Sequence, residues 1–255
     1  MPSLRRLAAA LLITLVAGVI LMFPARVAYH WFAPADLVLA AITGTVWKGS
    51  STHGSVAGVY LADLNWRIKP LSLFKGRIAY RVNTELAGGY IDGDVAATIA
   101  GNIVITDAKA ALSLDALAAG IGRRGLGGFA NADVEKLFLQ DGFIADAVGK
   151  VVIRDLQLAQ LGAQPIGGYL ADVSSTDEGI VALVEDTDGV IGINGRFLLR
   201  PNGQYQFLGS LAPKTETPQY LRDQTRYLGS PDANGEYEFR FEGVLNTGIL
   251  MPVRP

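Results

Sequence analysis

Short apolar runs alternate with polar residues along most of this chain, and this two-residue period is typical of β-strands with one face in water. Gly and Asn/Asp-Gly pairs separate the runs about every 8–12 residues, which is the spacing of hairpins. Asn194-Gly195, Asn202-Gly203 and Asn234-Gly235 are the strongest turn signals, because both central residues of a type I′ turn need positive φ. The pattern therefore predicts a largely antiparallel β-sheet. Weaker turn signals are Asp92-Gly93, Asp141-Gly142 and Asp188-Gly189.

Three segments define the strands best. In residues 77–86 apolar side chains alternate with Arg, Asn and Glu, which predicts a half-buried strand. Tyr237, Phe239 and Phe241 alternate with charged residues in the same way, so we expect these three rings to point inward in a tightly specified register. Residues 151–161 alternate less well, as in a central strand that is covered on both faces or contains a bulge.

Two short helices are expected to interrupt the strands. Ser113 is placed to cap a helix over residues 114–119, with Gly120 as its stop. Thr217 is placed to cap a second helix that begins at Pro218 and ends at Gly229. No repeat of fixed period and no Pro/Ser-rich linker divides the rest, so residues 35–255 are interpreted as one β-rich domain.

The N-terminus carries an apolar stretch from Leu7 to Phe23, near the lower limit of the roughly 17–25 residues that span a bilayer. Arg5 and Arg6 precede it, and basic residues stay on the cytoplasmic side. We therefore expect a cytoplasmic segment at 1–6, a transmembrane anchor at 7–23, a connector at 24–34 and an exported domain at 35–255. A cleaved signal peptide is the rival, but cutting after Ala25 or Ala28 would place a large residue at position −3.

Four residues in the predicted connector are compatible with two different locations. Tyr29, His30, Trp31 and Phe32 form an aromatic cluster of the kind found at the lipid headgroup level. A buried connector helix would use the same residues.

The composition argues against several classes of function. Without Arg5 and Arg6 the 22 basic residues fall to 20, against 24 acidic ones, so the exported part has a formal net charge of −4 and no basic footprint for nucleic acid. With no Cys and two His, the chain is poorly supplied for metal binding or acid–base catalysis. Hydrophobic residues make up 50% and charged residues 18%, below the roughly 25% charged of ordinary domains. This excess predicts either a partly open apolar groove or a sandwich.

Three segments resemble catalytic or ligand-binding motifs, but each is better explained as a loop or turn without a functional role. Residues 120–125 match G-x-G-x-x-G, but a predicted helix precedes them where a dinucleotide site needs a strand. Residues 185–189 place Gly too early for a calcium loop. Residues 50–53 contain Ser and His without a nucleophile elbow. We expect no catalytic residue, no cofactor and no bound metal.

Two Trp-containing segments and the C-terminal pattern carry a resemblance to a known family. Their motif residues are Gly44, Trp47, Gly49, Trp66, Pro70, Leu73, Gly76, Gly229, Pro231 and Gly235. Following a single N-terminal anchor, this arrangement resembles the general secretion pathway protein N family, the N component of type II secretion systems. The motif residues are mostly Gly, Trp, Pro and Leu, so we expect structural roles, and a Trp beside a Gly turn is most often packing.

The resemblance implies a function and a location. It implies a bacterial inner-membrane protein with one membrane span, a periplasmic domain and no enzymatic activity. Such a protein would be an accessory component of the apparatus that moves folded proteins across the outer membrane, and its partners would be other secretion subunits. The family is also distantly similar to AsmA-like proteins with curved antiparallel sheets and apolar grooves, so a membrane-tethered groove that binds phospholipid is the alternative.

Overall fold

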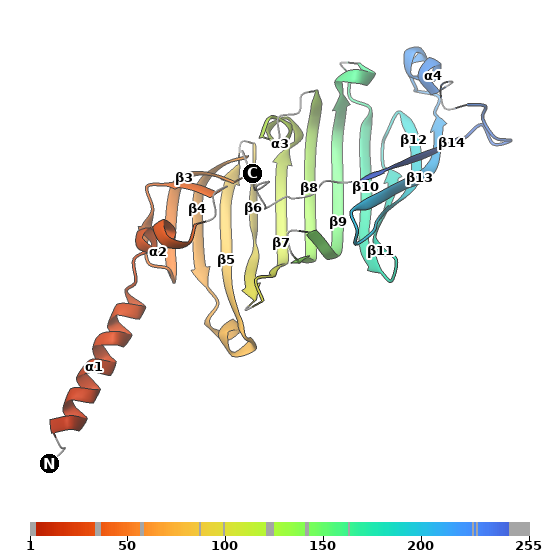
Figure 1. The fold of residues 1–255 in the computed structure, drawn as a ribbon. Helices are drawn as coiled ribbons and strands as arrows, with labels where there is room; N and C mark the ends of the chain where they lie inside the picture. Colours follow the sequence, from red (N-terminus) through yellow and green to blue (C-terminus); the bar gives the residue numbers. More distant parts are fainter. Residues whose placement is uncertain are drawn as a thin grey trace, which may run out of the picture.

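One antiparallel β-sheet organises the molecule (Figure 1). The computed structural model describes residues 4–33, 37–56, 59–86, 88–98, 100–120, 125–140, 143–162, 164–225, 227 and 229–244. The sheet has 14 strands, and from β3 onward each strand pairs with the next in the chain, while β1 and β2 both pair with β3. The predicted class, mainly β and antiparallel, is confirmed. Within the described residues no second sheet packs on the first, so the sandwich alternative is wrong.

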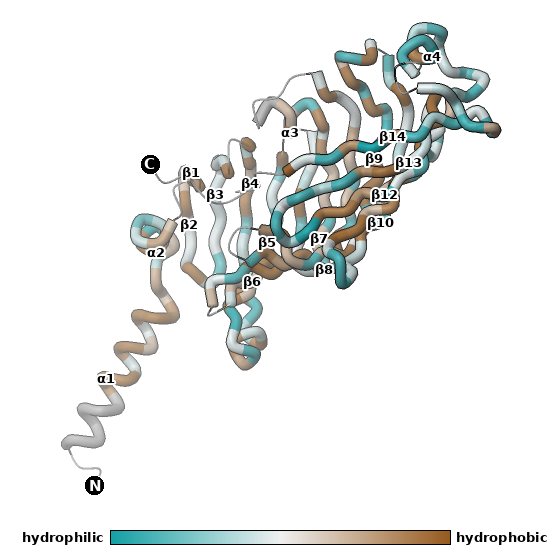
Figure 2. Tube along the Cα trace, turned by 45° about the vertical axis from the view of Figure 1, so that its right-hand side comes forward, coloured by the Kyte–Doolittle hydropathy of each residue, from teal (hydrophilic) through white to brown (hydrophobic). Residues whose placement is uncertain are grey.

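The strands lengthen toward the middle of the sheet. Their bounds are β1 Leu37–Ala40, β2 Thr43–Gly44, β3 Lys48–Val56, β4 Val59–Ile68, β5 Arg77–Leu86, β6 Gly89–Thr98, β7 Ile103–Ser113, β8 Leu126–Gln140, β9 Phe143–Leu158, β10 Gly167–Thr176, β11 Gly179–Asp186, β12 Ile191–Leu199, β13 Gln204–Pro213 and β14 Tyr237–Val244. β9 lies centrally between β8 and β10, as predicted, and both pairings contain register shifts. The last strands turn across the direction of the earlier ones, which curves the sheet (Figures 1 and 2).

Helical segments lie before the sheet and between its strands. They are α1 Leu4–Leu21, α2 Ala25–Phe32, the 3₁₀ turns η1 Pro70–Lys75 and η2 Ala159–Leu161, α3 Leu114–Gly120 and α4 Gln219–Thr225. In the part of the chain that the structure describes, no helix is both long and apolar enough to cross a membrane. Residues 25–32 do form a helix, but Trp31 and Phe32 are 65% and 77% exposed, so these two rings are not buried in a connector.

The two predicted helices have different outcomes. α3 is confirmed together with its cap, since Ser113 Oγ accepts the Ala116 N–H at 3.5 Å. α4 ends at Thr225 rather than Gly229. The Thr217 hydroxyl is buried against the sheet, where it donates to the Val190 carbonyl and accepts the Lys214 N–H. This hydroxyl therefore joins the start of the helix to the residue before β12 rather than capping the helix.

The turn predictions were partly wrong. Asn202-Gly203 joins β12 to β13, and Asn234-Gly235 lies in a tight turn before β14. Asn194-Gly195 instead lies inside β12, where a Cβ on Gly195 would come 2.7 Å from the Phe207 ring, so this glycine makes room for an aromatic side chain. Asp92-Gly93 lies inside β6 at a register shift. Asp188-Gly189 lies in the β11–β12 connection, and residues 141–142 lie outside the described residues.

The register places apolar residues on one face of the sheet from β4 to β14. Cross-strand pairs on this apolar face are Trp66–Val82, Tyr80–Val95, Ile105–Leu137, Val151–Ala171, Phe197–Phe207 and Phe207–Phe241. The opposite, charged face carries pairs such as Arg81–Asp94, Lys109–Asp133 and Lys150–Asp172. Most large side chains of the apolar face are only half-buried.

The tightest core lies at the C-terminal end of the apolar face. It is a buried cluster of Ile166, Tyr169, Ile191 and Leu221, the last contributed by α4. Tyr237, Phe239 and Phe241 share this face, as predicted. Phe241 is nevertheless 54% exposed, because β14 is an edge strand with β13 as its one described neighbour. Phe241 therefore lies on the predicted face but is only partly covered there.

Candidate functional site

An apolar cavity lies where α4 and η2 meet the apolar face. It is a cavity of about 280 Å³ lined by Leu161, Ile191, Ile193, Phe207, Leu211, Leu221, Gln224, Thr225, Phe239 and Phe241. Eight of these ten residues are apolar, so the walls offer dispersion contacts and little hydrogen bonding. We call this cavity, together with the apolar face onto which it opens, the apolar groove.

Aromatic rings form the wall on the sheet side of the apolar groove. The Phe207 ring lies 5.0 Å from the Phe239 ring and 6.2 Å from the Phe197 ring, both in edge-on arrangements. Phe239 and Phe241 lie 5.6 Å apart. Such ring pairs add about 0.5–1.5 kcal/mol each beyond the area they bury. The wall is therefore held in shape by the rings themselves.

The α4 segment forms the other wall and is fixed firmly to the sheet. Leu221 is 1% exposed and inserts into the core cluster. The Arg222 guanidinium donates to the backbone carbonyls of Lys214, Thr215 and Thr217 at 2.9 Å each. Because these carbonyls precede the helix, Arg222 fixes the connection from β13 into α4. The groove is thus preformed.

The first four motif residues converge where the sheet meets α1. Gly44 has φ +86°, and a Cβ there would lie 2.5 Å from the Lys48 carbonyl oxygen, so this tight turn requires glycine. Trp66 lies over Gly49, and its indole N–H donates to the Thr45 carbonyl at 3.2 Å. The Trp47 indole N–H donates to the Ile20 carbonyl in the last turn of α1 at 2.8 Å. Trp47 therefore joins the sheet to the N-terminal helix, a role that the packing interpretation missed.

The next three motif residues shape η1, between β4 and β5. Pro70 begins this turn, where its missing N–H is not needed. Gly76 ends it in the left-handed conformation, at φ 68°, and its N–H donates to the Leu73 carbonyl at 3.1 Å. Leu73 itself is 47% exposed. These residues thus build a turn rather than the core.

The last three motif residues lie at the far end of the sheet. Gly229, with φ +115°, and the exposed Pro231 belong to the connection between α4 and β14. Gly235 has φ +83° and donates its N–H to the Asp232 carbonyl at 3.1 Å. The ten motif residues therefore form three separate groups and no single site.

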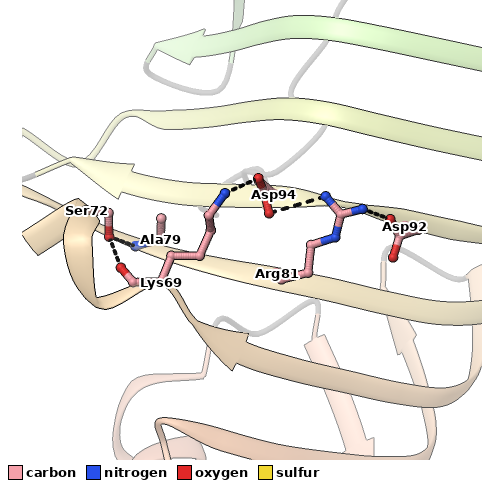
Figure 3. Close-up of polar contacts among 6 residues, drawn as sticks. All are labelled: Lys69, Ser72, Ala79, Arg81, Asp92 and Asp94. Carbon is pink, nitrogen blue, oxygen red and sulfur yellow. Dashed lines mark hydrogen bonds and ion pairs between the residues drawn. The ribbon is translucent and has the colours of Figure 1, made fainter.

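Sequence reasoning missed an ion-pair network beside η1, drawn in Figure 3. Asp94 is 5% exposed, and its carboxylate receives Lys69 Nζ at 2.5 Å and Arg81 Nη1 at 3.5 Å. Arg81 also pairs with Asp92. The sequence could have suggested the pairing of Arg81 with the two aspartates, because a hairpin of these two strands places them opposite each other. It could not have suggested Lys69, which reaches Asp94 only because η1 turns the chain back over β5. The network braces the turn.

The acidic and hydroxyl motifs have structural contacts. Asp188 Oδ1 accepts the Gly168 N–H at 2.6 Å, and Asp186 Oδ1 accepts the Ile193 N–H at 3.2 Å. The Ser51 hydroxyl donates to the Ala40 carbonyl at 2.6 Å, whereas the His53 ring contacts the Tyr60 hydroxyl at 2.7 Å. Ser51 and His53 thus do not form a nucleophile–base pair. Residues 121–124 of the glycine-rich segment lie outside the described residues.

Two groups with shifted pKa values also have structural causes. Burial, followed by the nearby Asp186 and Asp188 carboxylates, raises the pKa of Tyr169 to about 12. Hydrogen bonds from Lys136 and Ser175 lower the pKa of Asp146 on the charged face. Over the described ranges, no cluster of three or more His, Asp or Glu side chains is arranged to hold a metal ion.

Comparison with known proteins identifies the family. The model of "Type II secretion system (T2SS), protein N" matches residues 35–240. The chain belongs to the type II secretion system protein N family. It is 24% identical to type II secretion system protein N of Vibrio cholerae over 91% of this chain and 94% of that protein. It is 24% identical to the Aeromonas hydrophila protein over 93% of this chain and 97% of that protein. It is 28% identical to the Klebsiella pneumoniae protein over 82% of this chain and 83% of that protein. No solved structure matches the chain.

The family match covers all three groups of motif residues. It begins just before β1 and ends within β14, so the type II secretion system protein N domain corresponds to the single sheet described above. The apolar groove lies inside the matched region, except for the last ring, Phe241.

Proposed function

We propose that this chain is an inner-membrane accessory component of a type II secretion system, supporting the export of folded proteins across the outer membrane. The observation that carries the proposal is the family match over residues 35–240, together with relatives named type II secretion system protein N over nearly their whole length. In this proposal the protein has no enzymatic activity and works through contacts with other secretion subunits.

The proposed topology is a single-pass anchor. Residues 1–6 are cytoplasmic, 7–23 span the inner membrane, 24–34 connect, and 35–255 form the periplasmic domain. Supporting this are the Arg5-Arg6 pair before the apolar stretch and the exposed apolar side chains along the second half of α1, such as Leu11, Leu15 and Val19. The exposed Trp31 and Phe32 then lie at the headgroup level.

Subunit contacts are proposed at the C-terminal edge of the sheet. Among the described residues, β14 pairs with β13 alone, so its outer edge offers backbone donors and acceptors to a partner strand. Glu238 and Arg240 project from the charged face of this strand and would flank such a partner.

Deletion and crosslinking in a host that has its own type II system test the proposal. Removing the gene should lower the amount of exoprotein in the medium, and a plasmid copy should restore it. A photo-crosslinking residue at Arg240 should capture another secretion subunit, whereas one at Lys150 in central strand β9 should not. Unchanged secretion without the gene, with no secretion subunit captured, would contradict the proposal.

The half-exposed apolar face favours a second candidate, a membrane-tethered groove that binds phospholipid acyl chains. Its apolar side chains continue from β4 to β14 and most are only half-buried, whereas soluble monomers normally expose such side chains singly. The groove beneath α4 has hydrocarbon-lined walls and is preformed, and the proposed anchor brings it to a membrane, where acyl chains are abundant.

Crosslinking in intact membranes tests this candidate with a matched control. A photoreactive residue at Phe239 in the groove should form adducts whose mass equals that of a phospholipid. The same residue at Leu183, which is 55% exposed on the charged face, should not. Equal lipid labelling at the two positions, or none at Phe239, would rule out a specific lipid groove.

A further inference from the structure

The η1 turn exposes large apolar side chains where it connects the ends of β4 and β5. Phe74 is 90% exposed, Leu71 75% and Leu73 47%, and all three lie within four consecutive residues. A cluster of this kind on an exposed tip marks a surface that contacts something apolar.

Internal hydrogen bonds give this tip a defined shape. Ser72 Oγ donates to the Lys69 carbonyl at 2.6 Å and accepts the Ala79 N–H at 3.1 Å (Figure 3). Gly76 closes the turn, and the Lys69–Asp94 ion pair ties the residue just before it to β6. Because its backbone is braced in this way, the turn presents Leu71 and Phe74 outward as a fixed feature.

A short series of hydrogen bonds links the end of β4, just before η1, to the end of α1. The Ile68 N–H, two residues before η1, donates to the Trp47 carbonyl at 2.8 Å. The Trp47 indole in turn donates to the Ile20 carbonyl of α1 at 2.8 Å, and the neighbouring Val46 N–H donates to the Phe23 carbonyl at 3.0 Å. Figure 1 shows the consequence: η1, the golden turn below β4 and β5, projects from the same side of the sheet as α1.

The charge around the tip suits a lipid surface. Lys75 is exposed and Arg77 follows it, and no acidic residue occurs from Lys69 to Thr84. This local basic character contrasts with the net negative charge of residues 24–255. Apolar side chains at a tip, with Lys and Arg directly behind them, are the arrangement by which proteins lie in a bilayer interface that contains anionic lipid.

We propose that η1 is a second membrane contact, with Leu71, Leu73 and Phe74 entering the interface of the bilayer that α1 spans and Lys75 and Arg77 meeting its headgroups. This inference rests on the proposed anchor. The sheet is then held at two points, α1 and η1. The strand ends that carry η1 face the membrane, and the opposite strand ends, which carry α3 and α4, face away from it. The membrane thus sets the orientation of the apolar groove and of β14, in place of a flexible tether.

Single-cysteine labelling tests the contact in the full chain, because the natural sequence contains no Cys. The variants Phe74→Cys, Leu15→Cys and Tyr227→Cys carry an environment-sensitive fluorophore in vesicles of phosphatidylethanolamine and phosphatidylglycerol. Leu15 reports on the anchor. Tyr227, which is 91% exposed between α4 and β14 at the opposite edge, is the matched aromatic control. Lipids with a nitroxide near the headgroup or deep in the acyl chain serve as quenchers.

The proposal expects a distinct signal at each position. The label at 74 should shift to shorter wavelength and lose several-fold more intensity to the shallow quencher than the label at 227, while the label at 15 should respond to the deep quencher. Quenching at 15 with equal responses at 74 and 227 would overturn the η1 contact and leave the anchor standing. Quenching at 74 without quenching at 15 would support the contact and overturn the span. No quenching at 15 or 74 would overturn both.

Discussion

Replacing Gly49 by alanine tests whether the Trp66 seat holds the N-terminal end of the sheet together. The added methyl would lie 2.3 Å from Cζ2 of the Trp66 ring and 2.5 Å from the Thr43 carbonyl oxygen. Neither neighbour is the free end of a flexible side chain, since one is an indole ring and the other is backbone of the paired strand β2. Either the ring or strand β2 must therefore move.

The expected loss follows from those two displacements. Forcing an extra methyl into a filled site costs about 1–3 kcal/mol. If the ring moves, the 3.2 Å bond from its N–H to the Thr45 carbonyl is lost as well, which adds about 0.5–1.5 kcal/mol. We expect Gly49→Ala to lower the free energy of unfolding by about 2–4 kcal/mol, because the two terms add only in part.

Urea denaturation of the full chain in detergent, followed by circular dichroism, measures the loss. Gly192→Ala is the matched control, because it also lies within a strand and its new Cβ would have its nearest neighbours at 3.4 Å and 3.5 Å, ordinary contact distances. If the two variants unfold at the same urea concentration, Trp66 is not seated on Gly49 as described.

Three further expectations test other parts of the structure. Leu221→Ala should destabilise by about 2–5 kcal/mol by opening a cavity in the core cluster, whereas Tyr227→Ala should stay within about 0.5 kcal/mol; equal urea midpoints would contradict this. The folded-state pKa of Tyr169, about 12, lies above its ordinary value of 10.0, so the stabilisation from its neutral form is complete below pH 10 and lost as pH rises toward 12. Tyr169→Phe cannot ionise, so its stability should fall less than that of wild type across this range, and parallel curves would refute the assignment. Trp47→Phe removes the indole N–H that bonds to the Ile20 carbonyl, and hydrogen exchange in the Trp47 turn should become faster; unchanged protection would mean that this bond does not hold the turn.

The ion pairs of the charged face allow no comparable prediction of stability. Lys109–Asp133 and Lys150–Asp172 are well exposed, and pairs of this kind contribute about 0–1 kcal/mol. Their clearer effect is on register, since each joins residues directly opposite on neighbouring strands. A slip by one residue would bring apolar side chains into these positions.

Much of the sheet was predictable because strand patterning is local. In residues 77–86 and 237–241 the two-residue period alone assigned side chains to the correct faces, and the shared face of Tyr237, Phe239 and Phe241 followed from it. The α3 helix was predictable for the same reason, since its Ser113 cap lies next to it in the chain. The motif residues also identified the family, although their roles were described only as structural.

Only the tertiary structure shows the contacts between residues that lie far apart in the chain. Gly195 was predicted in a turn but lies opposite Gly209, where its missing side chain makes room for Phe207. Trp47 was assigned to packing, yet it binds the end of α1, 27 residues away in sequence. Local pattern sets which backbone conformation a segment prefers and which of its side chains are apolar. Whether an apolar face is covered, and what a polar group donates to, depends on which distant segment arrives beside it, and here the single curved sheet left that face half open.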